Sequence, residues 1–301
     1  MTMRVVPPIA IWEGLFTTNV LEDEHDEWSG EEIYAKGARV QWGHWIFESA
    51  QDGNEDHEPG PGAVDTEWWL VDMATNPYRV WEPFRSAYTS RAGFIDMTVT
   101  PGDVVKDISL YGLQGETAQV IGTHPVDGEF YNKTLALDAG YGEGNWFDLF
   151  YEYPRFRKKA PFLDIPPYAD ASYRIIVDNG SGEARIGNAV LGYGTDLGLT
   201  QFGYSASSLS FSTKKRNAFG RPTYQRGVSY QTLSVDVELP TPAFEGIREF
   251  LVEQDATAAA YIGSSSRDEL NVFAVYDDFR IVGGNPAKSG CALELQEVIL
   301  T

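Results

Sequence analysis

Five of the eight tryptophans in this chain fall between residues 28 and 69, in a short segment punctuated by glycine. They are Trp28, Trp42, Trp45, Trp68 and Trp69. A segment of this size cannot bury so many indole rings around a large core. We therefore expect a compact aromatic module in which some rings pack together and others face outward, where they are available to bind a ligand.

The spacing of residues inside this segment predicts short strands joined by tight turns. Trp45, Phe47 and Ser49 alternate at the two-residue period of a strand, and Gly43 permits a sharp turn before them. Residues 52–62 are rich in Gly, Asn, Asp and Pro and should form an exposed loop. The segment is therefore expected to be a small β unit.

The expected loop also carries oxygen donors in alternation, namely Asp52, Asn54, Asp56 and Glu58. A calcium loop uses this alternation, but His57 stands where such a loop requires glycine for its turn. A solvated loop is the simpler interpretation. We expect neither a bound metal nor a cofactor.

Several landmarks of the segment follow a recognisable order. Trp28 precedes the motif Tyr-x-x-Gly-x-x-Val at residues 34–40, Gly43 precedes an aromatic strand ending Phe-x-Ser, and a Pro-containing loop leads to Trp69. In this order the segment resembles the small chitin- and cellulose-binding modules of secreted chitinases. The resemblance implies that Trp28 occupies a sugar-binding position. The chain departs from that family after the strand, where residues 50–52 replace an exposed pair of aromatic residues.

The tryptophans therefore have two interpretations. All five are candidates for carbohydrate binding. The alternative is that most of them form the core of the module, because large aromatic side chains dominate small cores. A ring that stays on the surface would be the better platform for a sugar.

Charge is distributed unevenly along the chain. The formal net charge is −21, and residues 1–70 hold fifteen Asp or Glu against three Lys or Arg. Such a surface repels phosphate backbones and anionic lipids, so neither nucleic acid nor membrane insertion is expected. The acidic run at residues 22–27 should be a solvated approach to the module.

A basic run is the exception within this acidic chain. It is either a solvated turn or a surface that docks an acidic neighbour in an assembly, and we favour docking because opposite charges guide the register between subunits. The run consists of Arg155, Arg157, Lys158 and Lys159.

Length and hydrophobic content predict two or three domains with real cores. The chain has 301 residues, of which 43% are hydrophobic. The single cysteine, Cys291, rules out an intrachain disulfide, and no window predicts a membrane span or a secretion signal, so we expect synthesis and assembly in the cytosol. The expected units are residues 1–75 (an arm plus the module, with its core at 28–69), 76–195 and 196–301.

The middle unit should be a β-sandwich, because many short β-branched or aromatic segments alternate with Gly, Pro or Asp turns. A hairpin turn is expected at residues 178–182, which read Asp-Asn-Gly-Ser-Gly. The expected strands are Phe94–Val99, Val104–Leu110, Gln119–Ile121, Phe130–Leu137, Trp146–Tyr151, Ser172–Val177 and Ala184–Leu191.

The last unit combines strands with one clear helix. Residues 231–239 alternate apolar and polar side chains as a half-buried strand does. A helix should begin near Thr241-Pro242 and place Phe244, Ile247, Phe250 and Leu251 on one face. Further strands are expected at residues 270–276, 279–282 and 291–300. The fold class is therefore mainly β and multidomain: an aromatic module, a sandwich and a C-terminal α+β domain.

The order of short motifs along the whole chain is similar to a family of tailed-bacteriophage virion proteins. The motifs are the opening VVPP, EWWLVDMATNPYRVWE, DLFYEYPRFRKKAPFLDIPPYADASYRI, LGLTQFGYSASSLSFSTKKRNAFGRPTYQRG, AAYIGSS, VYDDFRI and CALELQEVIL. The resemblance implies a structural protein of the tail tip or baseplate, assembled in the bacterial cytoplasm with other tail proteins and with copies of itself in a ring. A role in host adsorption through surface glycans would follow.

Catalysis is not expected, and no catalytic residue is assigned. The four histidines all lie in the first half of the chain, and none stands beside a recognisable nucleophile elbow. Forty-four acidic residues make some carboxylate pair inevitable without making it a glycosidase site. Two alternatives remain open: a free glycan-binding protein or accessory module of a polysaccharide-degrading system, and a glycosidase.

Overall fold

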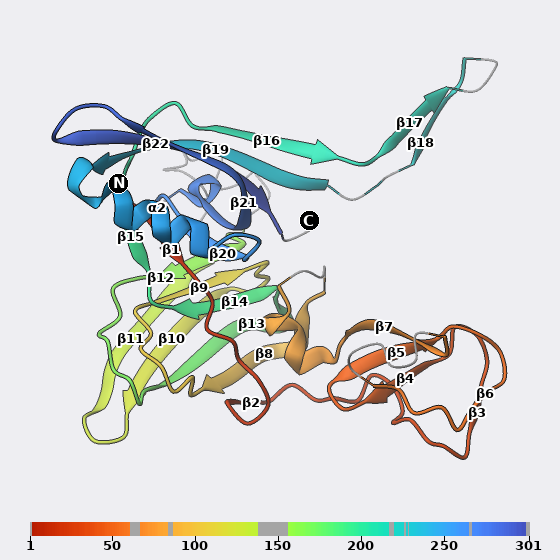
Figure 1. Cartoon of the computed structure of the whole chain (residues 1–301). Helices are drawn as coiled ribbons and strands as arrows, with labels where there is room; N and C mark the ends of the chain where they lie inside the picture. The colour runs from red at the N-terminus through yellow and green to blue at the C-terminus, as the bar shows by residue number, and fades with distance from the viewer. Residues whose placement is uncertain are drawn as a thin grey trace, which may run out of the picture.

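The computed structural model describes residues 2–60, 67–83, 87–137, 156–216, 220–225, 227, 229–264 and 267–298. Within these ranges the chain is mainly β, with several sheets and one α-helix, which confirms the predicted fold class (Figure 1). No helix in the described ranges is both long and apolar enough to cross a bilayer. The predicted strand at Trp146–Tyr151 lies outside the described residues.

The middle of the molecule is a β-sandwich, as predicted. A five-stranded sheet, in the order β11-β10-β13-β8-β2, faces a three-stranded sheet, in the order β12-β9-β14. Side chains from both sheets form one buried cluster, which includes Ile95, Ile175 and Leu110. The strands are β2 (Phe16–Thr18), β8 (Thr89–Val99), β9 (Asp107–Tyr111), β10 (Thr117–His124), β11 (Gly128–Ala136), β12 (Lys159–Phe162), β13 (Ser172–Ile186) and β14 (Asn188–Gly192).

The prediction of a hairpin turn at residues 178–182 is wrong. Both halves of β13 pair with the same neighbour, β8, because Asp178 lies opposite Phe94 and Glu183 lies opposite Ala92. The residues between them form a bulge, which Asn179 closes by donating from Nδ2 to the carbonyl oxygen of Glu183. The same turn-forming residues therefore make an insertion inside one long strand.

The C-terminal unit is a seven-stranded antiparallel sheet in the order β15-β1-β20-β21-β22-β19-β16. Because β15 also pairs with β19, the sheet closes on itself. Its strands are β1 (Thr2–Val6), β15 (Thr195–Thr200), β16 (Ser205–Ser210), β19 (Ser229–Pro240), β20 (Ala259–Ile262), β21 (Asn271–Gly283) and β22 (Lys288–Glu297). Strand β1 comes from the N-terminal arm, so the first and last parts of the chain share one core.

The predicted helix is present. The 3-10 turn η2 (Thr241–Ala243) leads into α2 (Phe244–Glu253), which buries Ile247 and Leu251 in the core of this sheet. Thr241 does not cap the helix, since its hydroxyl donates to the carbonyl oxygen of Asn285. The remaining elements of the unit are the hairpin β17 (Thr213–Arg216) with β18 (Pro222–Gln225), and the 3-10 turn η3 (Asp268–Leu270).

The C-terminal sheet is fixed to the sandwich through buried contacts. Tyr111 of β9 packs in one apolar cluster with Phe273 of β21, and its hydroxyl donates to Asn271 Oδ1 at 2.8 Å. Beside it, Arg4 of β1 binds the fully buried carboxylate of Asp107 at 2.8 Å. Residues far apart in the sequence therefore hold the two units together.

The aromatic module lies beside the sandwich, at the lower right of Figure 1, and the C-terminal sheet lies above the sandwich. It consists of the three-stranded sheet β4-β5-β7 and the short ladder β3-β6, and the 3-10 helix η1 leads from β7 toward β8. The expected loop at residues 52–62 is partly ordered into the core, because Asn54 and Pro59 are buried. The elements are β3 (Ile33–Tyr34), β4 (Arg39–Trp42), β5 (Trp45–Ser49), β6 (Asn54–Glu55), β7 (Trp69–Ala74) and η1 (Asn76–Trp81).

Candidate functional site

Trp69 is a core residue of the module. It is 3% exposed and packs with Tyr34, Val40 and Phe47. Its indole Nε1 donates to the carbonyl oxygen of His57 at 2.6 Å, which satisfies the donor inside the module. Trp69 therefore packs in the core of the module.

The other four candidate tryptophans are partly buried and pack against this core. Trp42 donates from Nε1 to Glu58 Oε1 at 3.1 Å, and Trp68 stacks on the ring of His57 with centroids 3.9 Å apart. The Nε1 atom of Trp28 is buried and has no hydrogen-bond partner within the described residues. The geometry thus gives Trp28, which the resemblance favoured for sugar binding, a packing role in the module.

The oxygen donors of the expected calcium loop do not act as a group. Asp52 accepts from the backbone N–H of Lys36, Glu58 accepts from Trp42, and Asn54 donates to Ser49 inside the core. Across the described ranges, no three His, Cys, Asp or Glu side chains come close enough together to hold a metal ion.

The fifth candidate, Trp45, lines a groove at the joint between the module and the sandwich. The groove has a volume of about 330 Å³. Its walls come from three separate parts of the chain: the N-terminal arm, the β4–β5 turn with the end of β7, and η1 with the residues after it. The lining residues are Ile11, Trp12, Glu13, His44, Trp45, Ala74, Tyr78, Trp81, Glu82 and Pro83.

Aromatic rings dominate this groove. Trp12 is 61% exposed, so one wall presents an open indole face. Tyr78 stacks on His44 with centroids 3.9 Å apart, and Phe16 meets Trp81 edge to face behind the groove. Because Tyr78 packs on His44 and Trp81 packs on Phe16, the orientations of these inner rings are fixed before any ligand arrives.

Hydrogen bonds set the position of His44 in the groove. Its Nδ1 lies 2.9 Å from Glu22, its Nε2 lies 3.1 Å from the hydroxyl of Tyr78, and Glu13 is 3.4 Å from the same nitrogen. Burial raises the pKa of Tyr78, and the nearby charges of Glu22 and Glu13 act in the same direction. The tyrosine hydroxyl therefore stays protonated and can donate.

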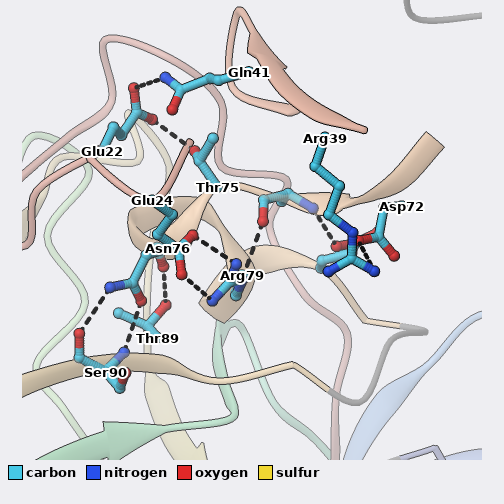
Figure 2. A network of polar contacts seen from close by, with 12 residues as sticks. Glu22, Glu24, Arg39, Gln41, Asp72, Thr75, Asn76, Arg79, Thr89 and Ser90 are labelled. Carbon is cyan, nitrogen blue, oxygen red and sulfur yellow. Dashed lines mark hydrogen bonds and ion pairs between the residues drawn. The ribbon is translucent and has the colours of Figure 1, made fainter. Parts of the chain in front are cut away.

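A polar network holds the module at a defined angle to η1 (Figure 2). Arg79 of η1 makes two hydrogen bonds to the carboxylate of Glu24, at 2.6 and 2.9 Å. Glu22 accepts from the hydroxyl of Thr75 at 2.7 Å and from the side-chain amide of Gln41 on β4. The prediction that residues 22–27 are merely solvated is therefore wrong for two members of the run, which bind η1 and the module.

The network continues into the sandwich. Asn76 at the start of η1 exchanges two hydrogen bonds with the backbone of Ser90 on β8, both 2.8 Å long. Thr89 donates to the carbonyl oxygen of Asn76 and accepts from the N–H of Val80 (Figure 2). The groove consequently sits on a rigid joint, as a preorganised binding site requires.

The groove can recognise a ligand that has both an apolar face and a polar rim. Indole and phenol rings supply flat apolar contacts. Two carboxylates supply acceptors: Glu13 at the open edge, and Glu82, whose Oε2 also accepts from the backbone N–H of Ala74. Trp81 adds a further aromatic ring to the lining.

The predicted basic run is engaged within the chain where the structure describes it. Arg157 pairs with Asp268 at 3.0 Å, and Lys159 pairs with Glu297 at 3.1 Å, so both anchor the sandwich to the C-terminal unit. Lys158 is exposed, whereas Arg155 lies outside the described residues. Docking of an assembly neighbour by this run stays a prediction.

A larger hollow of about 460 Å³ lies on the C-terminal sheet, but no aromatic side chain lines it. Trp12, Tyr78 and Trp81 lie outside residues 28–69 and meet Trp45 only across the folded joint, so the density of tryptophans does not single them out. The motif NPYRVWE, with two aromatic residues next to the module, was the available signal. No protein-family model matches the chain, and no curated protein matches it either.

Proposed function

We propose that the chain is a structural protein of the distal end of a phage tail that contacts host-surface glycans by binding rather than by catalysis. The observation that supports the contact is the joint groove, in which Trp12, Trp45, Tyr78 and Trp81 lie around one hollow with two carboxylates. The tail assignment rests on the order of motifs along the sequence. Interlocked β units with buried ion pairs between them suit a load-bearing component.

A saccharide fits the chemistry of this groove. The ring of a hexose has an apolar face of C–H groups and a rim of hydroxyls, so aromatic faces and carboxylate acceptors match it. The surrounding charge selects among sugars, because residues 1–70 carry fifteen acidic against three basic side chains. Neutral or amino sugars are therefore favoured over sulfated, phosphorylated or uronic ones.

Weak binding by a single groove is sufficient in an assembly. A symmetric tail presents several copies at once, and linked sites gain affinity through effective concentration without any new contact. The proposal therefore predicts weak binding by the isolated chain and strong binding by the particle.

The groove is tested by removing its most exposed ring. Trp12→Ala should weaken binding of the purified chain to neutral or amino-sugar oligosaccharides by roughly 2- to 10-fold, the worth of one aromatic contact. Phe202→Ala is the matched control, since Phe202 is an aromatic residue that is 89% exposed and does not line the groove. Equal affinities of the two variants would reject the groove as the binding site.

The location is tested separately by imaging. Antibodies against the chain, coupled to gold, should label one end of the tail in purified virions. Label that is present in lysates but missing from tails would reject the tail assignment and favour a free glycan-binding protein.

A glycosidase is the second candidate, because Glu13 and Glu82 both line the groove. Hydrolysis needs two opposed carboxylates, and Glu13→Gln would then abolish the release of reducing ends from bacterial polysaccharide. We expect no turnover by the wild-type chain in this assay.

A further inference from the structure

A long β arm projects from the C-terminal sheet, and nothing in the described chain covers it (Figure 1). The arm is defined here as residues 205–216 and 220–225, which include β16 and the hairpin β17–β18. Strand β16 pairs only with β19, and the hairpin forms a separate two-stranded ladder. Every residue of β16 and β18 is exposed.

The arm is the basic part of an acidic chain. The arm contains four Lys or Arg and no Asp or Glu. Because the whole chain carries −21, the remainder carries −25. Within the described residues, no carboxylate lies within ion-pairing distance of Lys214, Lys215 or Arg216 on the outer part of the arm.

Large apolar side chains are exposed among these charges. Phe211 is 63% exposed and Tyr224 is 73% exposed, and Tyr224 lies directly across the hairpin from Lys214. An arm this thin has no core in which to bury them. Exposed aromatic side chains mark protein contact surfaces, where Tyr, Phe and Arg are enriched.

The complementary surface is present on the module of the same chain. The ladder β3–β6 places Ile33, which is 66% exposed, opposite Glu55, and the exposed residues Glu31 and Glu32 precede it. We call this surface the acidic ladder. It has an apolar centre with carboxylates around it, whereas the arm has aromatic rings with cations around them.

We propose that the arm of one copy binds the acidic ladder of a second copy. In Figure 1 the arm, at the upper right, and the ladder β3–β6, at the lower right, lie far apart, so the arm does not cover the ladder of its own chain. Two different surfaces meet in such a contact, and repetition of a heterologous contact produces a ring when it closes. The inference rests on the proposed function in one respect: a tail component is the setting in which such a ring would operate.

Charge reversal tests the contact in sedimentation velocity experiments over a range of protein concentrations. The arm variant is Lys214→Glu/Lys215→Glu/Arg216→Glu, and the ladder variant is Glu31→Lys/Glu32→Lys/Glu55→Lys. Each variant alone should weaken self-association at least tenfold. The chain that carries both sets, and an equimolar mixture of the two variants, should recover it, because opposite charges face each other again.

Two comparisons make the test specific. Lys133→Glu/Arg248→Glu/Arg280→Glu changes the net charge by the same amount as the arm variant, but on other exposed surfaces, and should associate like the wild type. Wild-type association should weaken between about 0.05 M and about 0.5 M salt, since exposed charges are screened over a Debye length that shrinks with ionic strength. Near-ultraviolet circular dichroism verifies that each variant keeps its tertiary structure.

The proposal is overturned by a wild-type chain that stays monomeric, by an arm variant that associates normally, or by failure of the doubly reversed chain to recover. Tight binding of the arm to duplex DNA without self-association would also overturn it and assign the arm to nucleic acid. Saccharide affinity is measured on the same proteins. If the charge reversals do not affect self-association but Trp12→Ala weakens saccharide binding, only the arm contact is rejected. If the charge reversals behave as expected but Trp12→Ala leaves saccharide binding unchanged, only the glycan proposal is rejected.

Discussion

Replacement of Arg4 by methionine should destabilise the whole molecule, because this residue joins the C-terminal sheet to the sandwich. Its Nη1 lies 2.8 Å from both Asp107 and Asp164, and its Nε lies 2.7 Å from Asp196. The side chain of Asp107 is completely buried, whereas that of Asp164 is 74% exposed. The consequence of removing the cation therefore depends mainly on Asp107.

The magnitude follows from the charge that is left behind. Asp107 keeps hydrogen bonds from the backbone N–H groups of Asp164 and Gly194, but it loses its only counter-charge among the described residues. Removal of one partner from a buried ion pair typically costs about 3–5 kcal/mol. The exposed pair Arg174–Asp96 is the matched control, and Arg174→Met should cost no more than about 1 kcal/mol.

Urea unfolding, followed by tryptophan fluorescence and circular dichroism, measures both free-energy changes. Addition of Asp107→Asn to Arg4→Met should recover part of the loss, because the unpaired buried charge is then removed. If Arg4→Met costs no more than Arg174→Met, or if Asp107→Asn brings no recovery, the reasoning about the buried charge is refuted.

Four further predictions test other parts of the account. The Arg4 hydrogen bond holds the pKa of Asp164 below its ordinary value of 3.8. The Asp164 carboxylate therefore stabilises the fold above about pH 4, and this contribution is lost as the pH falls through the folded pKa. The urea midpoint should consequently drop more steeply in acid for the wild type than for Asp164→Asn. Trp69→Ala should destabilise the module by about 3–5 kcal/mol in urea unfolding, because a nearly buried indole is replaced by a cavity, whereas Val126→Ala, at an 85% exposed site, should change little. Gly192→Ala should lower the melting temperature, since the new methyl group would overlap the carbonyl oxygen of Pro7, and the open position Gly290→Ala should not clash. Burial raises the pKa of Cys291 to about 11, so iodoacetamide should label the folded chain slowly near neutral pH and the urea-unfolded chain quickly; equal rates would contradict the buried thiol.

The spacing of apolar residues predicted the strands and the helix whose formation depends on neighbouring residues in the sequence. The alternation in residues 231–239 became β19, and the apolar stripe of Phe244 to Leu251 became α2 against the sheet. The Asp-Asn-Gly sequence at residues 178–180 misled, because turn residues can also form a bulge when both flanking segments pair with one neighbouring strand. Only the folded partner distinguishes the two outcomes.

Long-range pairing could not be inferred from one sequence. Strand β1 lies between β15 and β20, which both follow it by nearly 200 residues or more along the chain. The periodicity of a strand does not indicate which distant strand it pairs with. The joint groove likewise depends on contacts between residues that are far apart in the sequence. Tryptophan density pointed to the module and thus to Trp45, but Trp12 and Trp81 come from other parts of the chain and meet it only in the folded structure.

Hydrogen exchange with and without saccharide measures the central claim most directly. When a saturating neutral or amino-sugar oligosaccharide is added, the account predicts slower exchange in residues 11–15, 43–46 and 78–83, which line the joint groove, and no change in the arm or in β3–β6. Protection confined to another surface, or unchanged exchange at every groove segment although binding is detected, would contradict it.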